Sequence, residues 1–229
     1  MKKPVFYTEF AYLLGIALVA LGTAMTAWGD LGISMVVAPA FILHLRMSQV
    51  FPWFTFGVAE YCLQGLVLIL MMCLLRKVKA TYFLSFITAI LYGLILDGST
   101  LLLSLLPQKL LWQRLAVYIG GDLLICAGVS MVFRTYLPPE AYEMFVMELS
   151  KKWHIKLHTL KTLYDCVSLV IAVALSFLLL GTLQGVGIAT VVCAFLNGSL
   201  ISLFSRLWDR IWNFADKFPW RKKFEESEK

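Results

Sequence analysis

The sequence predicts an all-α polytopic membrane protein: six transmembrane helices in a 3+3 inverted repeat, with two short amphipathic or re-entrant helices. Three observations predict this fold. Apolar residues make up 60% of the 229 residues and charged residues only 15%, whereas a soluble domain is about half apolar and a quarter charged. The apolar residues gather in runs close to the roughly 20 residues that span a bilayer. A residue pattern also recurs at an offset of 100 along the chain.

Six runs are long and apolar enough to span a membrane. A span that faces lipid must satisfy its own backbone hydrogen bonds, so each run is expected to be a helix. The first run follows Met1-Lys2-Lys3 and could be taken for a signal peptide, but it is too long and lacks a convincing small-x-small cleavage site. We therefore expect an uncleaved first span. The six predicted spans cover residues 6–28, 53–75, 82–105, 111–133, 162–180 and 186–207.

Lysine and arginine residues are distributed unevenly between the segments that join these spans. If the N-terminus lies in the cytoplasm, all of the 20 basic residues except Arg46, Lys109 and Arg114 fall in cytoplasmic segments. Such a bias sets the orientation of multi-span proteins. We therefore expect a multi-pass protein of the cell inner (plasma) membrane with both termini in the cytoplasm. The net charge of +6 then reflects topology rather than nucleic-acid binding.

Two further apolar stretches are too short to span a membrane. Residues 33–45 lie between the first two spans, and residues 138–153 lie between the fourth and the fifth. The second stretch has proline in its predicted first turn, followed by Glu140 and Glu143 near the positive end of the helix dipole. Two interpretations stay open: amphipathic helices that lie at the membrane surface, or half-helices that dip toward a central site.

The repeat is clearest in the third and sixth spans, where Asp97-Gly98-Ser99 and Asn197-Gly198-Ser199 occupy equivalent positions. At the same offset, Pro39 matches Pro139 at the head of each short stretch. Each half has three spans, an odd number, so the second copy must enter the membrane from the opposite side. The sequence predicts one three-helix repeat, an inverted second repeat and a cytoplasmic tail, over residues 1–110, 111–210 and 211–229.

Three segments also resemble a known family. They are LGTAMTAWGDLGIS at residues 21–34, LDG at residues 96–98 and LGTLQGVGIATVVCAFLNGSLI at residues 180–201. With these segments the chain resembles the YczE/YitT-like bacterial inner-membrane proteins over nearly its whole length. The resemblance implies a small multi-span protein of a group regarded as transporters, some of them linked to vitamin B6-responsive regulators. Family members often have Pro-Trp after the serine of the first segment, where this chain has Met35-Val36.

Polar and acidic residues inside the spans are the best candidates for a functional site. A carboxyl group near the bilayer centre costs roughly 2.5–3.5 kcal/mol on insertion scales, so it is expected to face a cavity or a partner. Glu60 and Gln64 lie one helical turn apart, and the repeat offers two mirrored sets, Glu60 with Asp97 and Asp165 with Asn197. The predicted substrate-binding residues are Asp122, Asp97, Asn197, Glu60, Gln64, Asp165, Tyr92 and Tyr164.

Some of these residues also have a purely structural interpretation. Asp97 and Asn197 precede glycine and could bond to the backbone at a helix break. Asp165 could pair with Lys161 one turn earlier. Asp122 has no nearby cation on its own helix, so it is the first choice for a group that gains and loses a proton.

The leading functional hypothesis is a secondary transporter of a small polar or charged organic molecule, with proton coupling as an option. Its site would lie at the membrane midplane between the repeats, where carboxylates bind a substrate amine or carry protons. One alternative is a substrate-capture or sensing subunit that needs a partner protein, and another is a channel.

Other classes of function are not expected. The sequence has no HExxH or GxSxG motif, so an enzyme is not predicted. The five cysteines have no CxxC spacing, so neither a metal nor another cofactor is predicted. The expected partners are a small-molecule substrate and the lipid bilayer, with no nucleic acid. A homodimer stays open, because six helices barely enclose a site.

Overall fold

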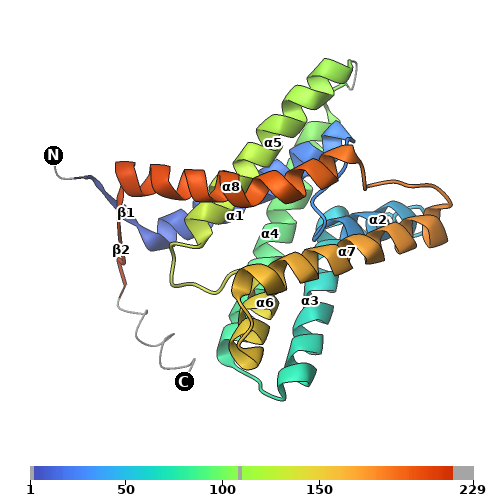
Figure 1. Cartoon of the computed structure of the whole chain (residues 1–229). Helices are drawn as coiled ribbons and strands as arrows, with labels where there is room; N and C mark the ends of the chain where they lie inside the picture. Colours follow the sequence, from blue (N-terminus) through green and yellow to red (C-terminus); the bar gives the residue numbers. More distant parts are fainter. Residues whose placement is uncertain (1–2, 108–109, 219–229) are drawn as a thin grey trace.

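The structure, a computed structural model, describes residues 3–107 and 110–218. These residues form eight α-helices and one pair of short strands (Figure 1). Six of the helices are long and apolar enough to cross a membrane, which confirms the predicted all-α polytopic fold. The six are α1 (Thr8–Gly29), α3 (Phe56–Leu75), α4 (Ala80–Ser104), α5 (Leu111–Val132), α7 (Leu157–Leu180) and α8 (Ile188–Ile211).

The long helices begin and end close to the predicted spans, and local chemistry explains the differences. α3 starts later than predicted because Thr55 caps it, with its Oγ1 accepting a hydrogen bond from the Val58 amide at 3.2 Å. α8 also starts later, after a loop in which Gly181 and Gly185 have the positive φ angles that glycine tolerates. α7 starts earlier than predicted, at Leu157.

The centre of the fold is the antiparallel crossing of α1 and α5. Two pairs of glycines meet there, Gly15 with Gly128 and Gly22 with Gly121. A Cβ atom on Gly15 would lie 2.9 Å from the Gly128 carbonyl oxygen, and one on Gly121 would lie 2.7 Å from the Gly22 carbonyl oxygen. No side chain fits between these backbones, so α1 and α5 make the close contact that small residues allow between membrane helices.

The other long helices pack around this pair. α4 lies against α1 and α3, and α8 lies against α5 (Figure 1). α3 and α4 form a close hairpin in which the Gly57 and Gly93 backbones meet. α7 and α8 are also consecutive, yet within the described residues they make at most marginal contact, and Figure 1 shows them apart. The two hairpins are therefore unequal, the first closed and the second open.

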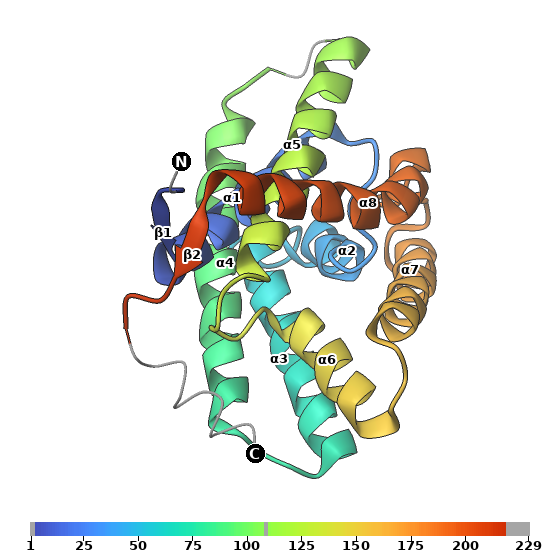
Figure 2. The same cartoon turned by 60° about the vertical axis from the view of Figure 1, so that its left-hand side comes forward.

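The two short helices are α2 (Ala38–Met47) and α6 (Ala141–Trp153). α2 packs between α3 and α7, and its residues Ala38, Ala40 and Ile42 are completely buried. α6 packs against α3, α4 and α7 (Figure 2). Both helices are thus held among the long ones, which agrees better with half-helices that dip into the bundle than with helices lying on its surface.

The predicted proline start is right for α2 but wrong for α6. Pro39 lies in the first turn of α2, whereas Pro138 and Pro139 precede α6. Their carbonyl oxygens accept hydrogen bonds from the Tyr12 hydroxyl of α1 at 3.1 Å and from the Ser85 hydroxyl of α4 at 2.5 Å. The two prolines therefore anchor the chain between α1 and α4 just before α6 begins.

Two glycine-containing loops interlock between the end of α1 and the start of α8. The Ile33 amide donates a hydrogen bond to the Gly185 carbonyl oxygen at 2.9 Å. A Cβ atom on Gly187 would overlap the Leu31 carbonyl group, and Gly32 has a φ angle of 122°. The glycines are needed here for close approach and for a backbone shape that other residues rarely adopt.

The two ends of the described chain meet. β1 (Val5–Tyr7) pairs in parallel with β2 (Asn213–Ala215), with Phe6 beside Phe214. Glu9 of α1 accepts hydrogen bonds from the Lys217 and Phe218 amides at 3.1 and 3.0 Å. Residues 213–218 of the predicted cytoplasmic tail are therefore bound to the start of α1, and residues 219–229 lie outside the described part of the chain.

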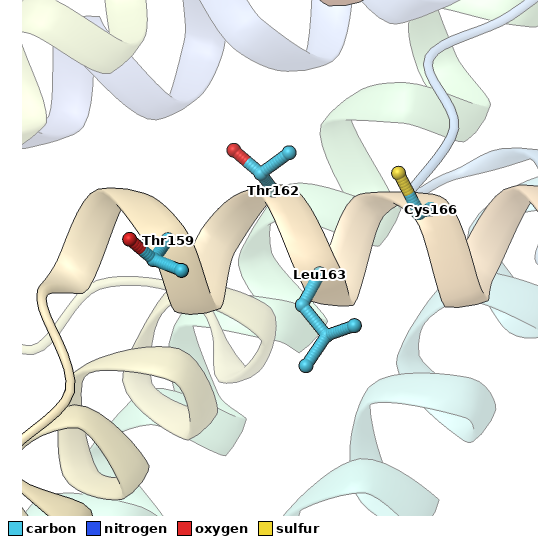
Figure 3. A pocket seen from close by; sticks show the side chains of 4 residues that line it. All are labelled: Thr159, Thr162, Leu163 and Cys166. Atoms are coloured by element: carbon cyan, nitrogen blue, oxygen red, sulfur yellow. The ribbon is translucent and has the colours of Figure 1, made fainter.

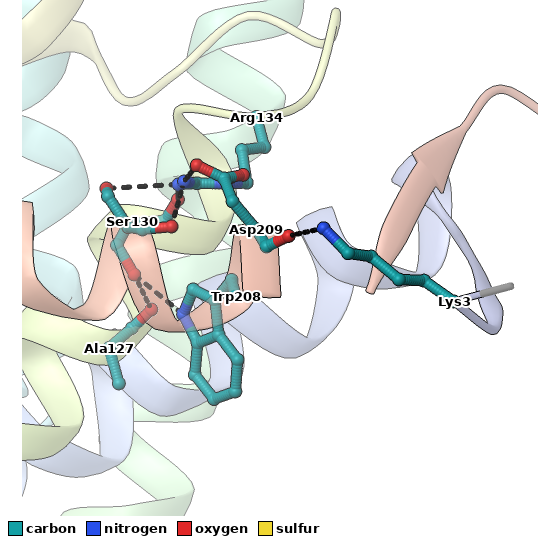
Figure 4. A network of polar contacts seen from close by, with 7 residues as sticks. Lys3, Ala127, Ser130, Arg134, Trp208 and Asp209 are labelled. Atoms are coloured by element: carbon teal, nitrogen blue, oxygen red, sulfur yellow. Dashed lines mark hydrogen bonds and ion pairs between the residues drawn. The ribbon is translucent and has the colours of Figure 1, made fainter. Parts of the chain in front are cut away.

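A polar network fastens the end of α8 to α5 (Figure 4). Arg134, just beyond α5, donates to the two carboxylate oxygens of Asp209 at 2.9 and 2.7 Å. The Trp208 indole N–H donates to the Ser130 hydroxyl of α5 at 2.8 Å. Lys3 joins the network by donating to the Asp209 carbonyl oxygen at 2.6 Å. The N-terminal segment, α5 and the end of α8 are thus tied at one place.

Candidate functional site

Glu60 and Gln64 of α3 are completely buried and bond to the start of α6. Glu60 Oε2 accepts hydrogen bonds from the Tyr142 hydroxyl at 3.1 Å and from Gln64 Nε2 at 3.5 Å. Gln64 Nε2 also donates to Glu140 Oε2 at 3.1 Å, and Gln64 Oε1 accepts from the Ala141 amide at 3.1 Å. One amide therefore bridges two carboxyl groups. We call this set the carboxyl cluster: Glu60, Gln64, Glu140 and Tyr142.

The second oxygen of Glu60 has no partner. Oε1 is buried and accepts no hydrogen bond from any residue that the structure describes. Leaving a buried acceptor unsatisfied costs about 1–3 kcal/mol, and more for a charged group. Such an atom inside a membrane span therefore points to an occupant that the folded chain does not itself supply.

The N-terminus of α6 points at the carboxyl cluster. At that end the Ala141 amide bonds to Gln64, and at the other end Lys152 donates to the Leu74 carbonyl oxygen, near the end of α3, at 2.6 Å. Gln64 lies roughly 15 Å from Leu74 along α3, so α6 runs from the interior of the bundle toward its end. The positive end of the α6 dipole is therefore beside the two carboxyl groups and stabilises negative charge there.

A layer of charged and aromatic side chains lies between α6 and α7. Lys161 Nζ is 3.6 Å from Glu143 Oε1 and 3.3 Å from Asp165 Oδ1. The Tyr164 ring packs against that of Tyr142, with centroids 6.3 Å apart. The side chains of Lys161, Glu143 and Asp165 are 35, 23 and 27% exposed, so this layer connects the carboxyl cluster with the molecular surface.

Acidic groups outnumber basic groups at this place. Lys161 serves Glu143 and Asp165, and in the described part of the chain no lysine or arginine lies within ion-pair distance of Glu60 or Glu140. Burial, together with the charges of Glu143 and Glu60, raises the pKa of Glu140 well above its ordinary value. The half-buried Glu140 therefore holds a proton more tightly than an exposed glutamate does.

Glu148, near the end of α6, is in the opposite situation. It lies 3.1 Å from Lys79 and 3.4 Å from Lys151, and the Tyr82 hydroxyl donates to it at 2.9 Å. Burial opposes its ionisation, but the hydrogen bonds from Tyr82 and Lys79 and the charges of the two lysines outweigh burial and lower the pKa of Glu148. This carboxylate holds α6 to the start of α4 as an anion.

We expect Glu148→Gln to lower the free energy of unfolding by about 2 kcal/mol near neutral pH, because Tyr82 and Lys79 lose a charged acceptor. A carboxyl group whose pKa is lowered by folding stabilises the protein above its unfolded pKa, and this stabilisation is lost as pH falls through the folded value. Unfolding of the purified protein in detergent, followed over a pH series, measures the difference from the wild type. The difference should shrink in acid, and a constant difference would show that the charge is not its cause.

Asp122 and Asn197 form a separate contact between α5 and α8. Asn197 Nδ2 donates to Asp122 Oδ1 at 3.0 Å. Cys193, one turn earlier in α8, lies 3.3 Å from the Tyr118 hydroxyl of α5. Asn197 Oδ1 is buried and has no hydrogen-bond partner among the described residues. The acid that the sequence ranks first thus belongs to a helix–helix contact that does not include Glu60.

Asp97 and Tyr92 of α4 bond to neighbouring helices. Asp97 accepts hydrogen bonds from the Thr55 hydroxyl and the Gly57 amide, each at 2.6 Å, and so caps α3. The Tyr92 hydroxyl donates to Thr23 of α1 at 3.1 Å. α4 passes through Asp97 without a break. Asp97 therefore does bond to backbone, as its structural interpretation expects, but on α3 rather than at a break in its own helix.

The structure brings together only part of the predicted site. The predicted residues that lie at or beside the carboxyl cluster are Glu60, Gln64, Tyr92, Tyr164 and Asp165. The predicted mirrored sets, Glu60 with Asp97 and Asp165 with Asn197, are not formed. Asp97 is occupied in capping α3, and Asn197 cannot meet Asp165 because α8 packs on α5 and not on α7.

Sequence reasoning assigns Glu140 and Glu143 to the helix start and does not single out Tyr142, and so misses all three as site residues. Their place follows from the path of the chain before α6, where Pro138 and Pro139 are held between α1 and α4. The available signal was a glutamate directly after Pro-Pro at the head of a short apolar helix. If such a helix dips into the bundle, its first residues become its deepest ones.

A shallow hollow lies on the exposed side of α7, lined by Thr159, Thr162, Leu163 and Cys166 (Figure 3). Figure 3 shows Thr162 and Cys166 pointing to one side of the helix and Leu163 to another. The hollow shares no residue with the carboxyl cluster and carries no charged lining residue. It is a feature of the α7 surface and not an entrance to the site.

Six membrane-length apolar helices, with a buried polar cluster between α3 and the start of α6, define an all-α, multi-pass membrane protein. No curated protein and no solved structure matches the chain. Residues 6–206 match the model of a family of unknown function, DUF6198, and the chain belongs to this family. The resemblance to YczE/YitT-like proteins stays a prediction.

Proposed function

We propose that the protein is a secondary transporter of a small polar or charged organic molecule, with its binding site at the carboxyl cluster and a preference for cations. The observation that carries the proposal is Glu60, a buried carboxyl group in a membrane span whose Oε1 has no partner among the described residues. Ionisable groups inside spans are costly, and they mark substrate and ion sites. The excess of acids over Lys161 favours a positively charged substrate.

The helix contacts support an inverted repeat. Exchanging α1–α4 with α5–α8 turns the contact of α1 with α4 into that of α5 with α8, and the contact of α2 with α7 into that of α6 with α3. The same exchange turns the Gly15–Gly128 pair into the Gly121–Gly22 pair, with an offset of 106 residues in α1 and α5 instead of the 100 found in the third and sixth spans. Carriers built in this way bind substrate where the two halves meet, often beside the N-terminus of a half-helix. The carboxyl cluster, formed by α3 and α6 beside α7, occupies such a position.

The unequal hairpins support alternating access. The α3–α4 hairpin is closed, whereas α7 and α8 lie apart in the described residues. In inverted-repeat carriers one repeat moves against the other around a fixed site. We propose that the opposite-facing state has the complementary arrangement, with α7 packed on α8 and α3 parted from α4. The bias of basic residues supports an inner-membrane protein with cytoplasmic termini.

The test is flux through the purified protein in liposomes, read with a radiolabel or a pH-sensitive dye. The probes are permanently charged cations such as tetramethylammonium, choline and guanidinium, compared with neutral and anionic metabolites. We expect uptake of at least one probe above protein-free liposomes. Glu60→Gln should reduce that uptake at least about tenfold, since about 1.4 kcal/mol of lost binding is a factor of ten. Asp30→Asn, the same carboxyl-to-amide change at an exposed residue, should leave it unchanged.

The outcome also separates the alternatives. If a probe binds without crossing the membrane, the protein is a substrate-capture subunit and not a carrier. If flux occurs equally in the wild type and in Glu60→Gln, the carboxyl cluster is not the site. Flux that never saturates with probe concentration would identify a channel.

A further inference from the structure

We infer that Glu60, Gln64 and Glu140 form a site that holds one exchangeable proton. The role of this site rests on the proposed transport function. In such a carrier, that proton is the coupling ion. Whether the proton is present is an independent matter, because it follows from the charges and hydrogen bonds around the two carboxyl groups and can be measured without any substrate.

The charges around Glu60 and Glu140 do not balance. Four carboxyl groups lie at this place, those of Glu60, Glu140, Glu143 and Asp165, and the one cation in contact with any of them among the described residues is Lys161. Lys161 contacts the outer two, Glu143 and Asp165. The inner two face each other across Gln64 Nε2, which is 3.5 Å from Glu60 and 3.1 Å from Glu140. Two negative charges at this separation inside the bundle would repel strongly.

Few groups around Glu60 and Glu140 stabilise a negative charge. The donors are the Tyr142 hydroxyl and the Gln64 side-chain amide, and the N-terminal end of α6 adds its positive partial charge. This set can satisfy one carboxylate. It leaves nothing for a second, and Glu60 Oε1 has no donor at all within the described chain. One negative charge and one proton is therefore the occupancy that the contacts support.

Glu60 Oε1 is the atom on which we place the proton. Adding it to Glu60 Oε1 displaces no existing hydrogen bond, because that oxygen accepts none in the described chain. The other oxygen, Oε2, keeps its bonds from Tyr142 and Gln64. A divalent metal is a poorer occupant, since the described residues contain no group of three histidine, cysteine or acidic side chains that could hold one.

Partly exposed residues beside the pair connect the proton with water. Glu140 is half-buried, and beyond it Glu143, Lys161 and Asp165 reach the surface. We expect the pair to exchange its proton with water through this partly exposed layer, of which Glu140 is the nearest member. The other titratable groups that face the pair are tyrosines in the described residues: Tyr12 from α1, Tyr92 from α4, Tyr142 from α6 and Tyr164 from α7. His44 of α2 bonds instead to the Phe54 carbonyl oxygen, at 2.9 Å.

Infrared difference spectroscopy of the purified full-length protein tests the inference, since only a protonated carboxyl group has a carboxylic-acid carbonyl stretch. The spectrum of a Glu60→Gln/Glu140→Gln double variant is subtracted from that of the wild type at neutral pH. We expect a band with the amplitude of one carboxyl group, lost in strong alkali. Glu148→Gln is the matched control, because Glu148 is held as an anion, and it should keep the wild-type band.

The single variants test the sharing of the proton. In Glu60→Gln or Glu140→Gln the remaining carboxyl group has no like charge across Gln64, so its band should disappear at lower pH than in the wild type. Stability gives a second measurement. A carboxyl group whose pKa is raised by folding stabilises the protein when protonated, and that stability is lost as pH rises through the folded value. The free energy of unfolding of the wild type in detergent should therefore fall toward alkaline pH, and that of Glu140→Gln should fall less.

No band in the wild-type difference spectrum overturns the inference, and so does a band of two carboxyl groups. The outcomes also separate this inference from the proposed function. A band without flux in liposomes leaves the proton site standing and removes the transporter. Flux that does not depend on a pH gradient, in a protein without the band, removes the proton site and leaves the transporter standing.

Discussion

Gly121→Leu should prevent the protein from folding. A Cβ atom at this position would lie 2.7 Å from the Gly22 carbonyl oxygen and 2.8 Å from the Met25 Cβ atom of α1. The obstacle is backbone and not the flexible end of a side chain, so α1 and α5 must part to admit even the first carbon of leucine. Overpacking of a core costs typically about 1–3 kcal/mol when neighbours can adjust, and here they cannot. We expect a cost above this range.

The measurement is the yield of monodisperse protein by gel filtration in detergent, followed by thermal unfolding. Gly98→Leu is the matched control. Gly98 lies on α4, in the acid-or-amide Gly-Ser pattern of the repeat, and a Cβ atom there would meet nothing within 4 Å in the described structure. The control should be produced and unfold like the wild type. Equal behaviour of the two variants would contradict the glycine contact as the centre of the fold.

Arg134→Ala should release the end of α8 from α5. Besides Asp209, the Arg134 guanidinium donates to the Ser205 hydroxyl at 3.0 Å and to the Ser130 carbonyl oxygen at 2.8 Å. α8 has few other packing partners, because it lies against α5 and apart from α7 within the described residues. Asp209 is 63% exposed, so the ion pair alone contributes little, but the whole fork of hydrogen bonds is expected to contribute about 2 kcal/mol.

Thermal unfolding in detergent measures this loss, with Arg134→Lys and Arg206→Ala as comparisons. Lysine keeps the charge but cannot reproduce the planar fork, so Arg134→Lys should lose more than half of the stabilisation. Arg206 is exposed on α8, and its removal should have little effect. If Arg134→Lys unfolds like the wild type, charge rather than hydrogen-bond geometry holds α8 in place.

The helices could be predicted from the sequence because membrane spans are set by local composition. A run of apolar residues specifies a span whatever its neighbours are, and the six runs became six helices. The Glu60–Gln64 pair was equally predictable, since one helical turn places both on one face of α3. The ion pair of Lys161 with Asp165, also one turn apart, belongs to the same class.

The contacts between helices could not be predicted in this way. Asp97 was expected near Glu60 because both belong to the first repeat, but its carboxylate is taken by the start of α3. Asn197 was expected with Asp165, yet it bonds to Asp122, which belonged to neither set, because α8 packs on α5. Glu140 joins the site because the chain before α6 is held between α1 and α4. Each of these outcomes depends on which helices pack together, and hydrophobic periodicity does not report that.

The parallel pairing of β1 with β2 constrains the order in which this protein can be made. Its two strands lie at opposite ends of the described chain, and the helix that packs on the glycine face of α1 is α5, the fourth span. During synthesis α1 is inserted before α5, so lipid covers the glycine face of α1 until α5 enters the bilayer. β1 stays unpaired for longer, because β2 is synthesised only after the sixth span. A chain cut short before residue 213 would lack this pairing, which can form only after all six spans have been synthesised.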